Sequence, residues 1–122
     1  EYNQRPRKKF LGARVEEYRF AQYVEDWRQK IERVGNLNYP PAASGRLYGD
    51  LVLTVAIKSS GELDRVEISR PSGHRILDLA AMRIVRLSAP FAPFPEAIRR
   101  DTDIIEITRT WKFTSEDGLH AN

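Results

Sequence analysis

The sequence predicts an α+β fold: a three-stranded antiparallel sheet with two main helices packed on one face, plus an N-terminal helix, related to βαββαβ arrangements. Three observations support this fold class. Apolar and polar residues alternate along 49–58 and again along 63–70, on either side of a short turn. A helical repeat of apolar residues follows over 74–87. Another alternating segment, 103–113, lies near the end of the chain.

The N-terminal part predicts a flexible segment followed by a helix. Residues 1–13 combine Pro6 and Gly12 with a run of basic side chains, which is typical of the flexible end of a linker. Apolar residues then recur at helical spacing over 14–34. We expect this helix to stop at Gly35-Asn36, because glycine and asparagine favour helix ends.

Two strands joined by a turn form the centre of the predicted sheet. In the first strand, 49–58, alternate residues from Leu51 to Ile57 share the face toward the core. Gly61 is the residue of the turn best able to adopt a positive φ. In the second strand, 63–70, Val66 and Ile68 are expected to face inward.

The second half of the chain predicts a helix, a loop and a last strand. The helix covers about 74–87, and its apolar face consists of Ile76, Leu77, Ala80, Ala81, Ile84 and Val85. Phe91 and Phe94 of the following loop are expected to be buried, since exposing both would be costly. The last strand covers 103–113, with Arg109 as the exception in an otherwise apolar row. We expect the domain to span 14–115 and residues 116–122 to be a flexible tail.

Composition argues against an enzyme. The 122 residues contain no cysteine and only two histidines, His74 and His120, so nucleophilic catalysis lacks its usual residues. Neither a glycine-rich phosphate loop nor a zinc-ligand spacing is present. The net charge of +3 permits an acidic partner, but no basic face carries the interleaved aromatics of single-strand binders. We therefore expect no catalytic residue, no metal, no cofactor and no nucleic acid.

Several short motifs, in order over about residues 36–114, resemble the C-terminal domain of TonB. Each is weak alone, but their order and spacing are fairly specific. They are Tyr39-Pro40, Gly49 at the start of a strand, Gly61 in the turn, Ser72-Gly73, Leu77-Asp78-x-Ala80-Ala81, the Phe-Ala-Pro-Phe-Pro loop at 91–95, and Trp111-Lys112-Phe113.

The resemblance implies a periplasmic domain whose parent chain is anchored in the inner membrane by an N-terminal helix absent from this sequence. TonB proteins work with ExbB and ExbD, and their C-terminal domain binds the TonB box, a short extended peptide of outer-membrane receptors. Proton-motive energy then drives the import of iron chelates, haem or cobalamin. In the family the last strand is a free sheet edge to which the TonB box adds as a further strand.

The resemblance also implies two groups of partner-binding residues. The edge strand supplies Ile104, Ile105, Glu106, Ile107, Thr108, Arg109, Thr110 and Trp111. The Tyr-Pro segment supplies Asn36, Leu37, Asn38, Tyr39 and Pro40. Because free edges also pair with one another, a homodimer is a further expectation.

Three other interpretations stay open at this point. A TolA-type periplasmic protein-binding domain is the nearest, although the Tyr-Pro and Leu-Asp-x-Ala-Ala motifs favour TonB. An RNA-recognition domain would need aromatic residues on a central strand, and residues 50–58 contain none. A purely structural or assembly domain is the third.

Overall fold

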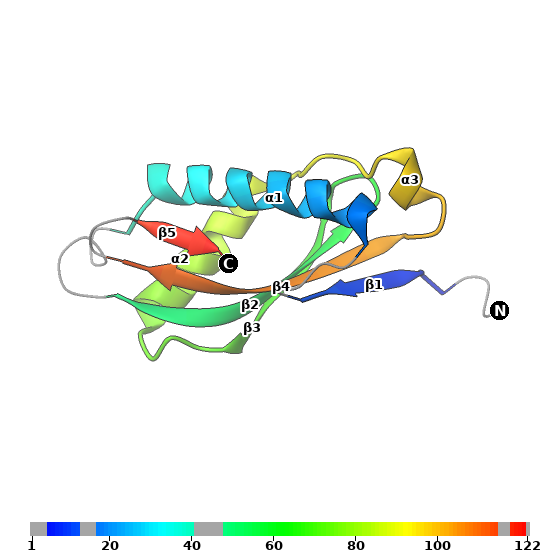
Figure 1. The fold of residues 1–122 in the computed structure, drawn as a ribbon. Helices are drawn as coiled ribbons and strands as arrows, with labels where there is room; N and C mark the ends of the chain where they lie inside the picture. Colours follow the sequence, from blue (N-terminus) through cyan, green and yellow to red (C-terminus); the bar gives the residue numbers. More distant parts are fainter. Residues whose placement is uncertain (1–4, 13–16, 41–47, 115–117, 122) are drawn as a thin grey trace.

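The structure is a computed structural model that describes residues 5–12, 17–40, 48–114 and 118–121. Residues 14–16 of the predicted N-terminal helix, 115 of the predicted domain, and parts of both predicted flexible ends lie outside the described residues. The elements follow one another as β1 (Lys8–Leu11), α1 (Tyr18–Leu37), β2 (Gly49–Lys58), β3 (Leu63–Arg70), α2 (Arg75–Ser88), α3 (Glu96–Arg99), β4 (Ile104–Phe113) and β5 (Leu119–Ala121). Figure 1 shows their arrangement.

The described strands form one mixed sheet. Its order is β1-β4-β2-β3, and β5 pairs with the end of β4. The strands β2 and β3 are antiparallel, as are β2 and β4, whereas β1 runs parallel to β4. The α+β class is therefore confirmed, but the sheet has five strands where the sequence predicted three.

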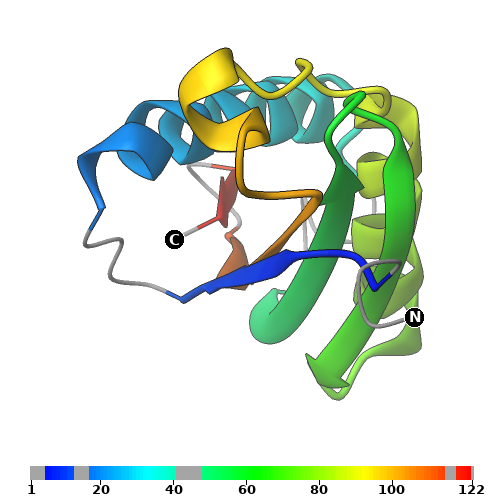
Figure 2. The same ribbon diagram turned by 90° about the vertical axis from the view of Figure 1, so that its right-hand side faces the viewer.

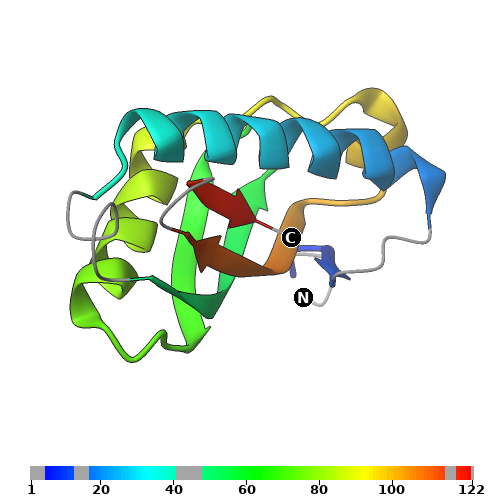
Figure 3. The same ribbon diagram turned by 60° about the vertical axis from the view of Figure 1, so that its left-hand side comes forward.

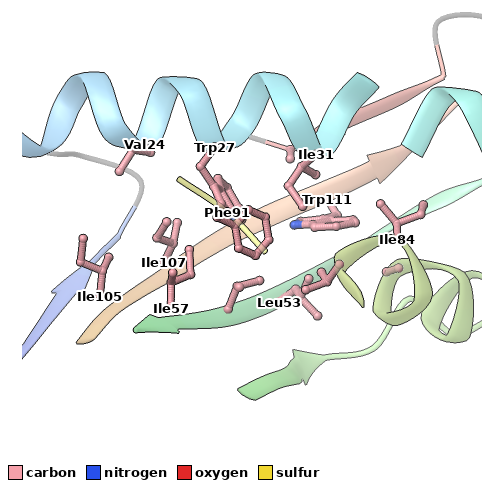
Figure 4. Packing of buried hydrophobic residues seen from close by; sticks show 14 of the residues in the cluster. Val24, Trp27, Ile31, Leu53, Ile57, Ile84, Phe91, Ile105, Ile107 and Trp111 are labelled. Atoms are coloured by element: carbon pink, nitrogen blue, oxygen red, sulfur yellow. The ribbon is translucent and has the colours of Figure 1, made fainter. Parts of the chain in front are cut away.

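Both long helices pack against the same face of the sheet. Figure 4 shows Val24, Trp27 and Ile31 of α1 above Ile107 and Trp111 of β4, with Ile84 of α2 beside them. The predicted inward row of β2, from Leu51 to Ile57, is fully buried. Phe91 and Phe94 are buried as predicted. Burial of these apolar surfaces is the main favourable contribution to folding.

Two predictions about the helices need correction: where the first helix ends, and which residues of the second are buried. The first helix continues past Gly35 to Leu37, because Gly35 is a point of close contact rather than a stop. A Cβ added at Gly35 would lie 2.4 Å from Cδ2 of Leu119, so the absence of a side chain lets β5 approach α1. In α2, Ile76 lies outside the buried stripe and is 52% exposed.

Both ends of the chain that were predicted to be flexible contain strands. Lys8–Leu11 pairs with Ile104–Ile107, and Leu119–Ala121 pairs with Trp111–Phe113. Figure 2 shows β1 crossing beside β4, and Figure 3 shows β5 lying between β4 and α1. Strands of three or four residues give only a weak periodic signal in the sequence, and backbone pairing with a neighbouring strand stabilises them.

Candidate peptide-binding edge of the sheet

The strand β4 has two unlike sides. On one side, all ten of its residues are in register with β2, from Ile104 opposite Lys58 to Phe113 opposite Gly49. The opposite side, here called the outer edge of β4, pairs with β1 at residues 104–107 and with β5 at residues 111–113. The prediction that β4 is a free edge is therefore wrong for residues 104–107 and for Trp111. At residues 108–110 no strand in the described part of the chain pairs with this side.

The outer edge presents the backbone of alternate residues only. The N–H of Ile104 donates to the carbonyl of Arg7 at 3.1 Å. Backbone direction alternates along a strand, and the register with β2 has no shift. The N–H and C=O groups of Glu106, Thr108 and Thr110 therefore face the outer edge as well. Those of the residues between them face β2, so half of the predicted edge residues cannot offer their backbone to a partner.

An arginine–carboxylate contact fixes the start of β1. The guanidinium of Arg7 donates to both carboxylate oxygens of Asp103, at 3.1 Å from Nε and 3.0 Å from Nη2. The N–H of Arg7 donates to the same carboxylate at 2.7 Å, and Nη1 donates to the carbonyl of Arg100 at 3.0 Å. The guanidinium lowers the pKa of the Asp103 carboxyl below its usual value, so this contact is charged near neutral pH.

A buried arginine holds the other end of β1. Arg109 is only 6% exposed and lies in the core-facing row of β4, where an apolar residue would be expected. Its Nη1 donates to the carbonyl of Leu11 at 3.2 Å and to that of Thr108 at 2.7 Å. It also donates to the carbonyl of Gly12. Burial lowers the pKa of Arg109, and no carboxylate in the described part of the chain forms an ion pair with it. Carbonyl groups at the end of β1 therefore provide the main partners of this cation.

On the face of the sheet opposite the helices, polar side chains lie beside the outer edge. Glu106 accepts hydrogen bonds from Arg65 of β3 at 2.8 and 3.3 Å, and Lys8 of β1 lies 3.7 Å from it. The hydroxyls of Thr108 and Thr54 are 2.8 Å apart. The arginine contact is the main cause of the lowered pKa of Glu106. This carboxylate links strands on both sides of β4, which sequence reasoning did not foresee.

Side chains of α1 cover the far side of β5. The N–H of Leu119 donates to Oδ1 of Asn36 at 2.9 Å, and the N–H of Ala121 donates to Oε2 of Glu32 at 2.9 Å. Leu119 and Ala121 are both buried. This segment is therefore built into the domain, and Asn36 holds β5 rather than facing an open site.

The Tyr-Pro segment lies at the end of β4. Leu37 ends α1 and is 80% exposed, while Asn38 caps the helix by donating twice to the carbonyl of Val34, at 3.0 and 2.8 Å. The hydroxyl of Tyr39 donates to the carbonyl of Thr114, and its ring packs on Phe113 with centroids 5.8 Å apart. These contacts bring the segment to the end of β4 and not to residues 104–111.

An apolar groove opens beside the Tyr-Pro segment. It has a volume of about 400 Å³. The exposed side chains of Ile76, Leu79 and Leu87 on α2 contribute to its wall. Its lining residues are Asn38, Tyr39, Pro40, Ile76, Leu79, Ala80, Arg83, Ile84 and Leu87.

The other border of the sheet is β3. No strand in the described ranges pairs with its outer side. Asp64, Arg65 and Glu67 place charges along it, and such charges discourage strand addition. This border therefore serves as the natural control for any test of the outer edge of β4.

The described residues offer neither a metal centre nor a membrane span. No three His, Cys, Asp or Glu side chains among them are grouped so that they could hold a metal ion. The helices in those same ranges are too short or too polar to cross a membrane.

Comparison with known proteins identifies the family. The family model for the C-terminal domain of the Gram-negative bacterial TonB protein matches residues 35–114, which is more than half of the chain. The NMR solution structure of the TonB C-terminal domain of Helicobacter pylori is similar, with a TM-score of 0.60 and 17% identity over 76% of this chain and 80% of that one. A search of curated proteins found no match. The chain therefore belongs to the family of TonB protein C-terminal domains.

Proposed function

We propose that this domain belongs to a TonB-like energy transducer and binds the TonB box of outer-membrane receptors by strand addition to the outer edge of β4. Domains of this family lie in the periplasm and interact with outer-membrane receptors. The observation that best supports the proposal is that two separate segments, β1 and β5, already pair with this edge. The edge is thus able to accept added strands in both directions.

In this proposal, backbone hydrogen bonds supply the affinity for the peptide, and side chains determine which peptides bind best. The outward-facing groups of Ile104, Glu106, Thr108 and Thr110 allow about four to six hydrogen bonds to an extended peptide. Each contributes roughly 0.5–1.5 kcal/mol, and ordering the peptide offsets part of the sum. The resulting affinity is modest, which suits a contact that is released in each cycle. The side chains of Thr108 and Thr110 lie where they can discriminate between peptides.

The remaining parts of the proposal follow from the family. The domain would bind and pull rather than catalyse a reaction. ExbB and ExbD would deliver proton-motive energy through an inner-membrane anchor in the parent chain, and the cargo would be an iron chelate, haem or cobalamin. The TolA-type alternative has no specific observation in its favour and becomes an outcome of the test.

Single-cysteine cross-linking tests the proposed edge, because the chain contains no native cysteine. Thr110→Cys places a thiol on the outer edge of β4, between the segments that pair with β1 and β5. Asp64→Cys places a thiol on β3 as the matched control. Each variant is mixed with peptides from the N-termini of outer-membrane receptors, each carrying one cysteine within its TonB box.

The proposal expects rapid disulfide formation at Thr110→Cys and little at Asp64→Cys. Unlabelled peptide without cysteine should suppress the cross-link by competition. Equal cross-linking at both positions would contradict the assigned edge. No binding across a broad panel of TonB boxes would favour a TolA-type partner instead.

A further inference from the structure

The segment β1 occupies the backbone groups that the proposed peptide would need. Lys8 is aligned with Ile104 and Leu11 with Ile107, in parallel. The carbonyl of Arg7 accepts the N–H groups of Asp103 at 2.7 Å and Ile104 at 3.1 Å. A receptor peptide and β1 therefore cannot pair with these residues at the same time.

The contacts that hold β1 are of a kind that exchanges easily. Its pairing covers four residues, against ten for the pairing of β2 with β4. Lys8 and Phe10 are exposed, and Lys9 and Leu11 are only partly covered. The ion pairs of Arg7 with Asp103 and of Lys9 with Glu17 are largely exposed, and solvent and salt weaken such pairs. Segments with little buried surface open at low free-energy cost.

Arginine contacts at its two ends set the position of β1, and between them Lys8 lies 3.7 Å from the buried carboxylate of Glu106. Asp103 fixes Arg7 at the start, and the buried guanidinium of Arg109 binds the carbonyls of Leu11 and Gly12 at the end. When β1 leaves, Arg109 loses two of its three carbonyl acceptors and keeps only that of Thr108. A buried cation with too few acceptors is costly. A displacing strand must therefore offer a carbonyl or a carboxylate at this position.

We propose that β1 is a built-in competitor for the outer edge of β4, held by Arg7 and Arg109, and that the receptor peptide binds only after displacing it. This inference rests on the proposed function, because it describes the regulation of the same edge. The apparent affinity for the peptide equals the intrinsic affinity multiplied by the fraction of molecules in which β1 is released, so it is low while β1 is mostly bound. The domain thus resists weak extended peptides and protects its edge from pairing with other chains.

A reversible covalent lock tests this competition within the full chain. Phe10 and Glu106 are aligned in register. Neighbouring strands lie about 4.8 Å apart, which suits a disulfide between Phe10→Cys and Glu106→Cys. Peptide binding is measured for the oxidised and the reduced form of the same double variant, with the Glu106→Cys single variant under both conditions as the control.

The inference expects the oxidised form to bind receptor peptide at least about tenfold more weakly than the reduced form, since locking removes the competent fraction. The single variant should not respond to the reductant. Equal binding by the locked and reduced forms would overturn the inference while leaving the proposed function intact.

A pair of proline variants tests the opposite direction. Backbone alternation from Arg7 places the N–H of Lys9 toward β4 and the N–H of Phe10 away from it. Lys9→Pro should therefore release β1 and strengthen peptide binding several-fold, whereas Phe10→Pro should change it little. Weaker binding by Lys9→Pro would overturn the inference.

Amide hydrogen exchange gives a readout that needs no peptide. The amides of Glu106 and Thr108 should exchange faster than those of Ile105 and Ile107, and Lys9→Pro should accelerate only the first pair. Exchange of all four at one common rate would show that β1 opens only on global unfolding, which overturns the competition. If the amides of Glu106 and Thr108 exchange faster but no receptor peptide binds, β1 is still an exchangeable strand. That outcome would contradict the proposed function and not the release of β1.

Discussion

The two sides of β4 differ in how much of the strand is paired. On the side toward β2, backbone pairing is continuous over all ten residues of β4. The side chains of β4 that point to the helices, such as Ile107 and Trp111, are fully buried. On the outer edge, two short segments from opposite ends of the chain share the strand. The longer pairing therefore lies on one side, and the other side is where we propose that strand exchange and peptide binding take place.

The largest expected effect is a difference in unfolding free energy between proline variants at two neighbouring residues, whose N–H groups face opposite sides of β4. Ile107→Pro removes an N–H that faces β2 in a buried ladder and should unfold much of the domain. The orphaned acceptor alone costs about 1–3 kcal/mol. Thr108→Pro removes an N–H on the outer edge, where proline is tolerated. Urea unfolding should show a large loss for the first variant and at most about 1 kcal/mol for the second. Similar losses for both would mean that the two sides are equally structural.

The next effect concerns the more firmly attached of the two outer segments. Gly35→Leu places a side chain where Leu119 packs against α1 and should detach β5. We expect a loss of about 1–3 kcal/mol from overpacking, which better helix propensity only partly offsets. Faster exchange of the Leu119 and Ala121 amides measures the detachment. Combining it with Leu119→Ala should restore much of the stability, and a failure to do so would exclude this contact as the cause.

A smaller effect on stability is expected for Arg109, whose contacts hold β1 but are not needed for the core to fold. Arg109→Met keeps a long side chain in the core-facing row of β4 but removes the donor to Leu11 and Gly12. Since apolar residues often replace buried charges without loss, the unfolding free energy should stay within about 1 kcal/mol. Exchange of the Thr108 amide should nevertheless rise, because β1 loses its end contact. An unfolded variant would show that Arg109 is needed for the core.

The smallest effect follows from pH. The pKa of Asp103 is lowered in the folded protein, so its ion pair with Arg7 is fully formed above the pKa of the unfolded chain, roughly 3.9. That contribution is lost as pH falls through the lower, folded pKa. Protection of the Ile104 amide should therefore drop about two- to fivefold in acid.

Asp103→Asn supplies the control for the pH series. It should show the low protection at every pH, because the charged contact with Arg7 is absent throughout. High protection of the Ile104 amide in this variant near neutral pH would mean that the ion pair does not hold β1.

Sequence reasoning predicted the core of the domain well because its signal is periodic. The buried rows of β2 and β4 and the burial of Phe91 and Phe94 all follow from apolar patterns. It failed at β1 and β5, where four and three residues form strands through backbone contacts with a distant partner. The basic residues around Lys8 resembled a linker, and nothing local revealed that Glu106 and Glu17 lie nearby. The alternation of Leu119 and Ala121 after Gly118 was the one available clue to β5.

Some features of the candidate site could likewise be read from the sequence, and others could not. The outward-facing positions along β4 could be chosen from the sequence only as a continuous range, since their direction depends on the register with Arg7. The position of Arg109 was visible as an apolar row interrupted by a charge. Two of its three acceptors, however, belong to a segment 97 or 98 residues away. Asn36 was predicted as a partner contact, which stays a prediction, and nothing local in the sequence indicated that its side chain accepts the N–H of Leu119 in β5.

The most direct test of the account is an NMR titration of the ¹⁵N-labelled chain with receptor N-terminal peptides. The account predicts coupled changes: new shifts at Glu106, Thr108 and Thr110, together with loss of the strand signals of Lys8–Leu11 as the peptide takes their place. Changes confined to β3, with the signals of Lys8–Leu11 unaltered at saturation, would contradict both the proposed edge and its displacement.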